Sequence, residues 1–165
     1  MKERLNYAAA NPAVAKAMAA LEGTVKQSGL ERPLLELVKM RASMINGCAY
    51  CVDMHSKDAR ADGETEQRLY ALSAWREAPF YTERERAALA WTEAVTNVAQ
   101  THVPDDVFDE ARKCFSEKEL VDLTLAVISI NGYNRLAISF RRVPGAYQPA
   151  TSRSIASSSP GPARG

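Results

Sequence analysis

Apolar residues recur along most of this chain at intervals of three and four, which is the spacing of one face of an α-helix. Proline and glycine fall at the ends of these apolar stretches rather than inside them. We find no convincing strand pattern between them. The pattern therefore predicts an all-α protein folded as a compact helical bundle.

Four helices are expected in the first half of the chain. Asn11 followed by Pro12 is typical of a helix start, with Asn11 as the N-cap. Pro33 opens a second helix, whose apolar stripe ends at Asn46-Gly47, and a third helix follows at once. The predicted ranges are 12–28, 33–46, 48–61 and 64–75.

Two capping boxes define the helices of the second half. Thr82 with Glu85, and Ser116 with Glu119, each place a hydroxyl three residues before a glutamate at a helix start. The predicted ranges are 83–95, 104–115 and 117–140. The last helix is apolar around much of its circumference, so we expect it to be central or shared with another subunit of a homo-oligomer.

From residue 144 the composition changes to Gly, Pro, Ser, Ala and Arg, which is typical of a flexible tail. We therefore expect one helical domain over residues 1–143 and a flexible C-terminal tail over residues 144–165.

Charge and length narrow the possible partners and location. The chain has 165 residues, and 21 Lys plus Arg nearly balance 20 Asp plus Glu, so nothing favours nucleic acid or an anionic membrane. The Ala-rich start is interrupted by Asn11, Pro12 and Lys16, and no apolar run reaches the ~20 residues of a membrane span. We predict a cytoplasmic protein. Three cysteines in such a chain point to catalysis or metal binding rather than to a secreted disulfide framework.

The stretch from Cys48 to His55 carries the chemistry. On a helix, positions 48, 51 and 55 lie within about 60° of one another, so both sulfurs and the imidazole share a surface. Cys48 follows Gly47 and sits in the first turn, where free backbone N–H groups stabilise a thiolate. His55 lies one turn past Cys51 and can take its proton. We interpret Cys48 and Cys51 as a redox-active pair that can close a disulfide.

Glu36 is the expected partner of His55. Only Asn46-Gly47 joins the second and third helices, which favours a tight antiparallel hairpin. Counted from that turn, Glu36 and His55 are offset by only ~4 to 5 Å along the helix axis. Glu36 can therefore orient His55, directly or through one water.

Other interpretations of these residues stay open. The two cysteines could be buried, inert thiols. They could instead bind zinc with His55, with Glu36, Cys114 or His102 as the fourth ligand, although the second ligand pair typical of structural zinc sites is missing. We expect no metal and no organic cofactor.

Several residues have plainer structural interpretations. Glu36 could be a surface partner of Lys39 at i, i+3. Cys114, Trp75 and Trp91 are expected to be structural, His102 to be exposed, and the run Asn131-Gly-Tyr-Asn-Arg135 to be a polar break inside the long helix.

The spacing around the cysteines resembles that of a known family. Glu36, Cys48 twelve positions later, the Cys-x-x-Cys pair and His55 closely resemble the alkylhydroperoxidase AhpD-like branch of the carboxymuconolactone decarboxylase family. The similarity continues through His55-Ser-Lys-Asp-Ala-Arg-Ala-Asp-Gly-Glu64 and the segment from Phe80 to Thr96.

The resemblance implies a helical subunit that assembles into trimers or hexamers and reduces peroxides. By that resemblance, Cys51 is the peroxidatic thiolate, Cys48 the resolving thiol, and His55 with Glu36 the proton relay. A dithiol reductant or reductase protein then reopens the disulfide. This chain departs from the best-known members at Tyr50, where they have a histidine, and a phenol there can donate a hydrogen bond to a peroxide oxygen.

Two alternatives differ from a peroxidase. One is a non-catalytic or metal-binding helical module on the same scaffold. The other is a decarboxylase, which we favour less because that branch lacks the cysteine pair.

Overall fold

The computed structural model describes residues 2–149, and within that range every regular element is a helix. The all-α prediction is therefore confirmed. The elements are α1 (Tyr7–Ala10), α2 (Pro12–Lys26), α3 (Arg32–Asn46), α4 (Ala49–Ala61), α5 (Glu66–Ala71), the 3-10 turn η1 (Leu72–Ala74), α6 (Glu83–Thr96), α7 (Val98–Thr101), α8 (Asp105–Cys114) and α9 (Glu117–Phe140).

Side-chain caps set several of these boundaries. The Asn11 side chain accepts from the first backbone N–H groups of α2, with Pro12 at its first position. The capping boxes at Thr82 and Ser116 are both present. The short helices α1 and α7 were not predicted, and the predicted helix 64–75 divides into α5 and η1.

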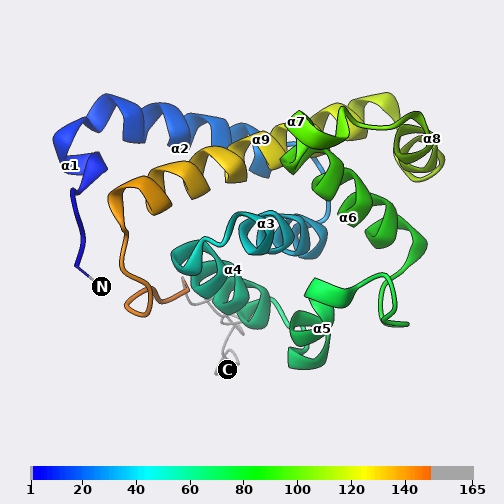
Figure 1. Cartoon of the computed structure of the whole chain (residues 1–165), viewed down its shortest axis with the longest axis horizontal. Helices are drawn as coiled ribbons and strands as arrows, with labels where there is room; N and C mark the ends of the chain where they lie inside the picture. The colour runs from blue at the N-terminus through cyan, green and yellow to red at the C-terminus, as the bar shows by residue number, and fades with distance from the viewer. Residues whose placement is uncertain (1, 150–165) are drawn as a thin grey trace, which may run out of the picture.

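Helix α3 lies at the centre of the molecule and packs against α4, α6 and α9 (Figure 1). It ends at Gly47, whose φ of 68° is a left-handed conformation that glycine adopts without strain. The N–H of Cys48 then donates to the carbonyl of Ser43 at 2.9 Å. This turn leaves only Gly47 and Cys48 between α3 and α4, so the cysteine pair starts next to the central helix.

Helix α9 buries one side and exposes the other. Leu123, Val127 and Ile130 are buried, whereas Val121 and Ile128 are 69% and 51% exposed. The apolar surface of α9 is thus only partly covered by the other helices of the same chain. The predicted homo-oligomer stays a prediction.

The chain past α9 keeps contact with the bundle. Gly145 and Tyr147 both hydrogen-bond to side chains of α4, so these contacts extend beyond the boundary predicted at residue 144. Residues 150–165 of the predicted flexible tail lie outside the described residues. Among residues 2–149, no helix combines the length and the hydropathy that crossing a membrane would require.

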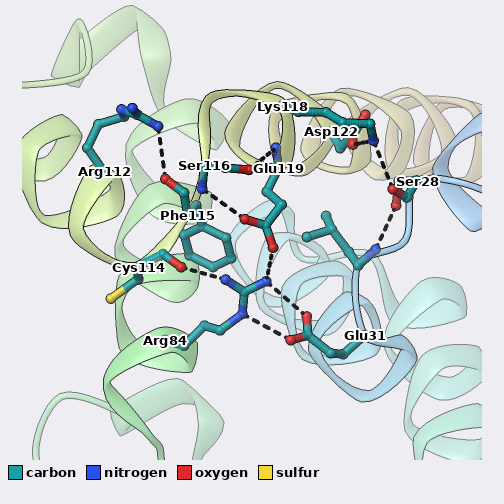
Figure 2. Close-up of polar contacts among 11 residues, drawn as sticks. Ser28, Glu31, Arg84, Arg112, Cys114, Phe115, Ser116, Lys118, Glu119 and Asp122 are labelled. Carbon is teal, nitrogen blue, oxygen red and sulfur yellow. Dashed lines mark hydrogen bonds and ion pairs between the residues drawn. The ribbon is translucent and has the colours of Figure 1, made fainter.

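Arg84 ties three parts of the fold together (Figure 2). From α6, its guanidinium donates to Glu31 before α3 at 3.1 and 3.2 Å and to Glu119 in α9 at 2.7 Å. It also donates to the carbonyl of Cys114 and lies over the ring of Phe115 at 4.1 Å. The hydrogen bond from the N–H of Ser116, together with Arg84, lowers the pKa of the Glu119 carboxyl to about 2.

Arg84→Met is expected to lower the free energy of unfolding by about 1–2 kcal/mol, because it removes several charge-assisted hydrogen bonds at once. This expected loss is at the lower end of the range for charge-assisted hydrogen bonds, because the Glu31 side chain is 56% exposed and water screens its charge. Chemical denaturation measures the change. Arg141→Met, at an exposed arginine, is the control and should change stability by less than about 0.5 kcal/mol. Equal stability of the two variants would contradict a structural role for Arg84.

Candidate active site around Cys48, Cys51 and His55

The candidate catalytic residues predicted at the start of α4 and within it are all buried and lie close together. Cys48 is the N-cap of the helix rather than a member of its first turn, and Cys51 and His55 follow within the helix. The three residues are only 1%, 2% and 6% exposed. Both cysteines are free thiols and pack with Ala42 of α3 and Ile130 of α9.

The two thiols titrate as a pair. A hydrogen bond from Cys51 lowers the pKa of Cys48 to about 7 despite its burial. The same hydrogen bond, together with burial and the charge on Cys48, raises the pKa of Cys51. One proton therefore leaves the pair near neutral pH, and the second is held far more tightly.

Thiolate absorbance should show this first ionisation in Cys114→Ser protein, where Cys48 and Cys51 are the remaining thiols. Below pH 7 the pair should be fully protonated, and above about pH 7 it should carry one thiolate. Cys51→Ala in the same background removes the hydrogen-bond donor to the Cys48 thiolate and should move the midpoint toward the ordinary thiol value of ~8.5. A midpoint at or above that value with both cysteines present would contradict the coupled pair.

The predicted register between Glu36 and His55 is present. Nδ1 of His55 donates to Oε2 of Glu36 at 2.7 Å, and both side chains are buried. This bond fixes the imidazole and leaves its other nitrogen for a second partner.

A chain of buried and half-buried charged groups continues behind Glu36. Nζ of Lys39 lies 3.8 Å from Oε1 of Glu36 and donates to Glu22 of α2 at 2.6 Å, and Glu22 accepts from Ser129 of α9 at 3.1 Å. Burial opposes ionisation of Glu36, but the hydrogen bond from His55 and the charges of His55 and Lys39 outweigh it, so the pKa of Glu36 is lowered. The alternative that made Glu36 and Lys39 a surface pair is therefore wrong, since Lys39 is 3% exposed.

Asn134 is a site residue that the sequence did not indicate. The run from Asn131 to Arg135, expected to be a polar break, lies within the continuous helix α9. Asn134 is fully buried, donates to Ser43 at 3.0 Å and accepts from Asn46 at 2.8 Å. Its amide also hydrogen-bonds to the cysteine pair, which lowers the pKa of each thiol.

Tyr50 lies beside the pair with its ring 4.0 Å from the guanidinium carbon of Arg142. Burial raises the pKa of its phenol, although Arg142 acts in the opposite direction. Tyr50 is therefore protonated at neutral pH and retains its hydroxyl as a hydrogen-bond donor.

A cavity of about 690 Å³ opens onto these residues. Its walls include Cys51, His55, Glu36 and Tyr50, whereas Cys48 is not among the lining residues. The sulfur that a bound molecule can meet is thus Cys51, and the sulfur that ionises first is Cys48.

The residues of the zinc alternative do not come together as a set. Cys114 lies at the end of α8 and packs against the hydrophobic core. His102 follows α7 and is exposed. Among residues 2–149, the group with metal-compatible spacing is instead Glu36, His55 and Asp58, whose ligand atoms lie within 4.8 Å of one another. An ion there would have to replace the hydrogen bond between Glu36 and His55. Trp75 and Trp91 are buried, as predicted.

Comparison with protein families gives a match over the same region. The model of the carboxymuconolactone decarboxylase family matches residues 12–94, which include Glu36, Cys48, Cys51 and His55. The uncharacterized protein YdfG of Bacillus subtilis is 43% identical over 139 residues, which cover 84% of this chain and 95% of YdfG.

Solved structures share the fold. A protein of unknown function from Agrobacterium tumefaciens, named as a candidate antioxidant defence protein AhpD, is 51% identical with a TM-score of 0.86. The match covers 88% of this chain and 100% of that protein. The debrominase Bmp8 is 25% identical with a TM-score of 0.75, over 84% of this chain and 74% of Bmp8.

Proposed function

This chain belongs to the carboxymuconolactone decarboxylase family, and from that premise we propose that it is an AhpD-like thiol peroxidase. The observation that carries the proposal is the position of Cys51, which lines the cavity while it hydrogen-bonds to Cys48. The hydrogen bond between His55 and Glu36 supports it further. The similarity to the AhpD-like protein of Agrobacterium tumefaciens agrees with this chemistry.

The reaction begins when Cys51 attacks the O–O bond of a peroxide in the cavity. The S–O bond forms as the O–O bond breaks, so Cys51 becomes a sulfenic acid and the peroxide leaves as an alcohol after gaining a proton. The thiolate of Cys48 then attacks the sulfenic sulfur, so the S–S bond forms as the S–O bond breaks. The leaving hydroxide gains a proton to become water, and the Cys48–Cys51 disulfide is closed. A dithiol reductant returns two electrons and two protons to the pair and is itself oxidised to a disulfide.

In this mechanism His55 accepts a proton, and Tyr50 orients the peroxide. Since Cys48 ionises first, Cys51 becomes the nucleophile by passing its proton to Cys48 or to the free nitrogen of His55. Glu36 holds the imidazole in place for this transfer. Tyr50 donates a hydrogen bond to a peroxide oxygen, in the role that we predicted from its phenol.

Reduced Cys114→Ser protein treated with one equivalent of an organic hydroperoxide tests the proposal. We expect loss of both thiols, a Cys48–Cys51 disulfide in the peptide map and recovery of the thiols with a dithiol. Protein that keeps both thiols under these conditions would exclude the peroxidase cycle.

The similarity to debrominase Bmp8 favours one second candidate, reductive removal of bromide by the same pair. The two thiols would supply two electrons, so that the C–Br bond becomes C–H, bromide and a proton leave, and the disulfide forms. Bromide release from a brominated pyrrole, with no oxidation by peroxide, would favour this candidate over the first.

A further inference from the structure

The chain after α9 turns back and lies along α4, and we call residues 143–149 the strap. In Figure 1 it is the orange segment that descends from the end of α9 toward α4. The N–H of Gly145 donates to Oδ2 of Asp53 at 3.0 Å. Lys57 donates to the carbonyls of Gly145 and Tyr147, both at 3.1 Å. Two side chains of α4 therefore hold the strap by its backbone.

These contacts direct Tyr147 into the site. Tyr147 is half-buried, lines the cavity that holds Cys51, and donates to Oδ1 of Asp58 at 2.7 Å. A carboxylate oxygen of Asp58 lies within 4.8 Å of the facing atoms of Glu36 and His55. Burial and then Asp58 raise the pKa of Tyr147 to about 12, so its hydroxyl stays a donor. Tyr147 thus extends from the strap to the edge of the proton relay.

The segment that leads into the strap also lines the cavity. Arg142, one residue before the strap, covers the ring of Tyr50 and shares the cavity wall with Tyr147. Arg142 and Tyr147 both lie outside residues 12–94, the part that the family model matches. This part of the cavity wall is therefore supplied from outside the matched core.

We propose that the strap forms one wall of the substrate cavity and that Tyr147 is a specificity-determining residue, which limits the size of molecules that reach Cys51. The substrate class rests on the proposed peroxidase function, but the control of access to Cys51 does not. Small peroxides fit beside the Tyr147 ring, whereas bulky ones require the ring and its bond to Asp58 to move.

Alkylation of Cys51 measures this access without any turnover. In reduced Cys114→Ser protein, rates with iodoacetamide and with a bulky aryl maleimide are compared, and the modified cysteine is identified by peptide mapping. Tyr147→Ala should raise the maleimide rate at Cys51 about tenfold or more, because it removes both the ring and the hydrogen bond that holds the ring to the charged Asp58. The iodoacetamide rate should rise much less. Tyr147→Phe, which keeps the ring, should stay closer to the parent protein.

The anchors of the strap provide a second test that leaves the cavity wall intact. Asp53 and Lys57 do not line the cavity, so Asp53→Asn and Lys57→Met should raise the maleimide rate only by loosening the strap. Lys113→Met breaks a comparable surface ion pair with Glu110 on α8 and should leave the rate unchanged. Circular dichroism checks that each variant is folded.

Peroxide kinetics then separate access from function. Tyr147→Ala should raise the ratio of kcat/KM for cumene hydroperoxide to that for hydrogen peroxide. Faster alkylation without turnover of either peroxide would support the strap and reject the peroxidase. Unchanged maleimide rates in folded Tyr147→Ala and Lys57→Met proteins would overturn the strap proposal whatever the peroxide kinetics.

Discussion

Cys51→Ser is expected to abolish peroxide consumption with a dithiol donor, whereas Cys48→Ser should leave one turnover and a trapped sulfenic acid. Cys51 lines the cavity, and a serine hydroxyl there cannot attack an O–O bond at neutral pH. Without Cys48 the sulfenic acid on Cys51 has no partner thiol beside it. Steady-state peroxide loss and trapping with a sulfenic acid reagent measure the two outcomes.

The pattern of the two variants also decides which sulfur is the nucleophile. Cys48 has the lower pKa, so a trapped sulfenic acid in Cys51→Ser protein would move the peroxidatic role to Cys48. Cys114→Ser is the matched control, because Cys114 lies on α8 away from the cavity lining, and it should retain full activity. Full activity in all three variants would rule out the mechanism.

Glu36→Gln is expected to lower kcat/KM for peroxide about 10²-fold or more, in the range of lost acid–base catalysis. Glutamine keeps the shape of the side chain but removes the charge that holds the imidazole of His55 at 2.7 Å. Since the pKa of Glu36 lies below its usual value, the wild-type carboxylate is ionised throughout the neutral range. The deficit should therefore persist across that range. Wild-type activity should fall first as the cysteine pair protonates near pH 7, and protonation of Glu36 should add a further loss only below its ordinary pKa of 4.5.

Glu110→Gln is the control for this change, because Glu110 is 63% exposed and pairs only with a surface lysine. It should leave kcat/KM unchanged. A folded Glu36→Gln protein with wild-type kinetics at every pH would remove Glu36 from the mechanism.

Local rules were enough to predict much of the fold. The caps at Asn11, Thr82 and Ser116 set helix starts because a side-chain oxygen satisfies N–H groups within three residues. The contact between Glu36 and His55 was also predictable, since a two-residue connection leaves few ways to align α3 with α4. These are interactions whose partners are near in sequence.

The rest of the site depends on packing between distant segments. Ser129 and Glu22 are separated by 107 positions, and Tyr147 and Asp58 by 89, so no spacing rule connects them. In the sequence, Asn134 is an ordinary polar residue of α9. Its role follows only from the packing of that helix beside the two thiols. The angle between helices determines which polar residues of α9 face inward. The apolar pattern of α9 is too broad to predict which residues these are.

The buried charges around Glu36 have a consequence for proton movement. Glu22 and Glu36 contribute two negative charges and Lys39 one positive charge, so these three groups leave a single negative charge beside His55. When the imidazole accepts a proton from a thiol, that remaining charge is cancelled. The negative charge of the site then lies on the thiolate, and Coulomb attraction between the imidazolium and the two carboxylates opposes the cost of placing a cation there. Docking of α2, which brings in Glu22, is thus an electrostatic requirement of the site as well as a contribution to the fold.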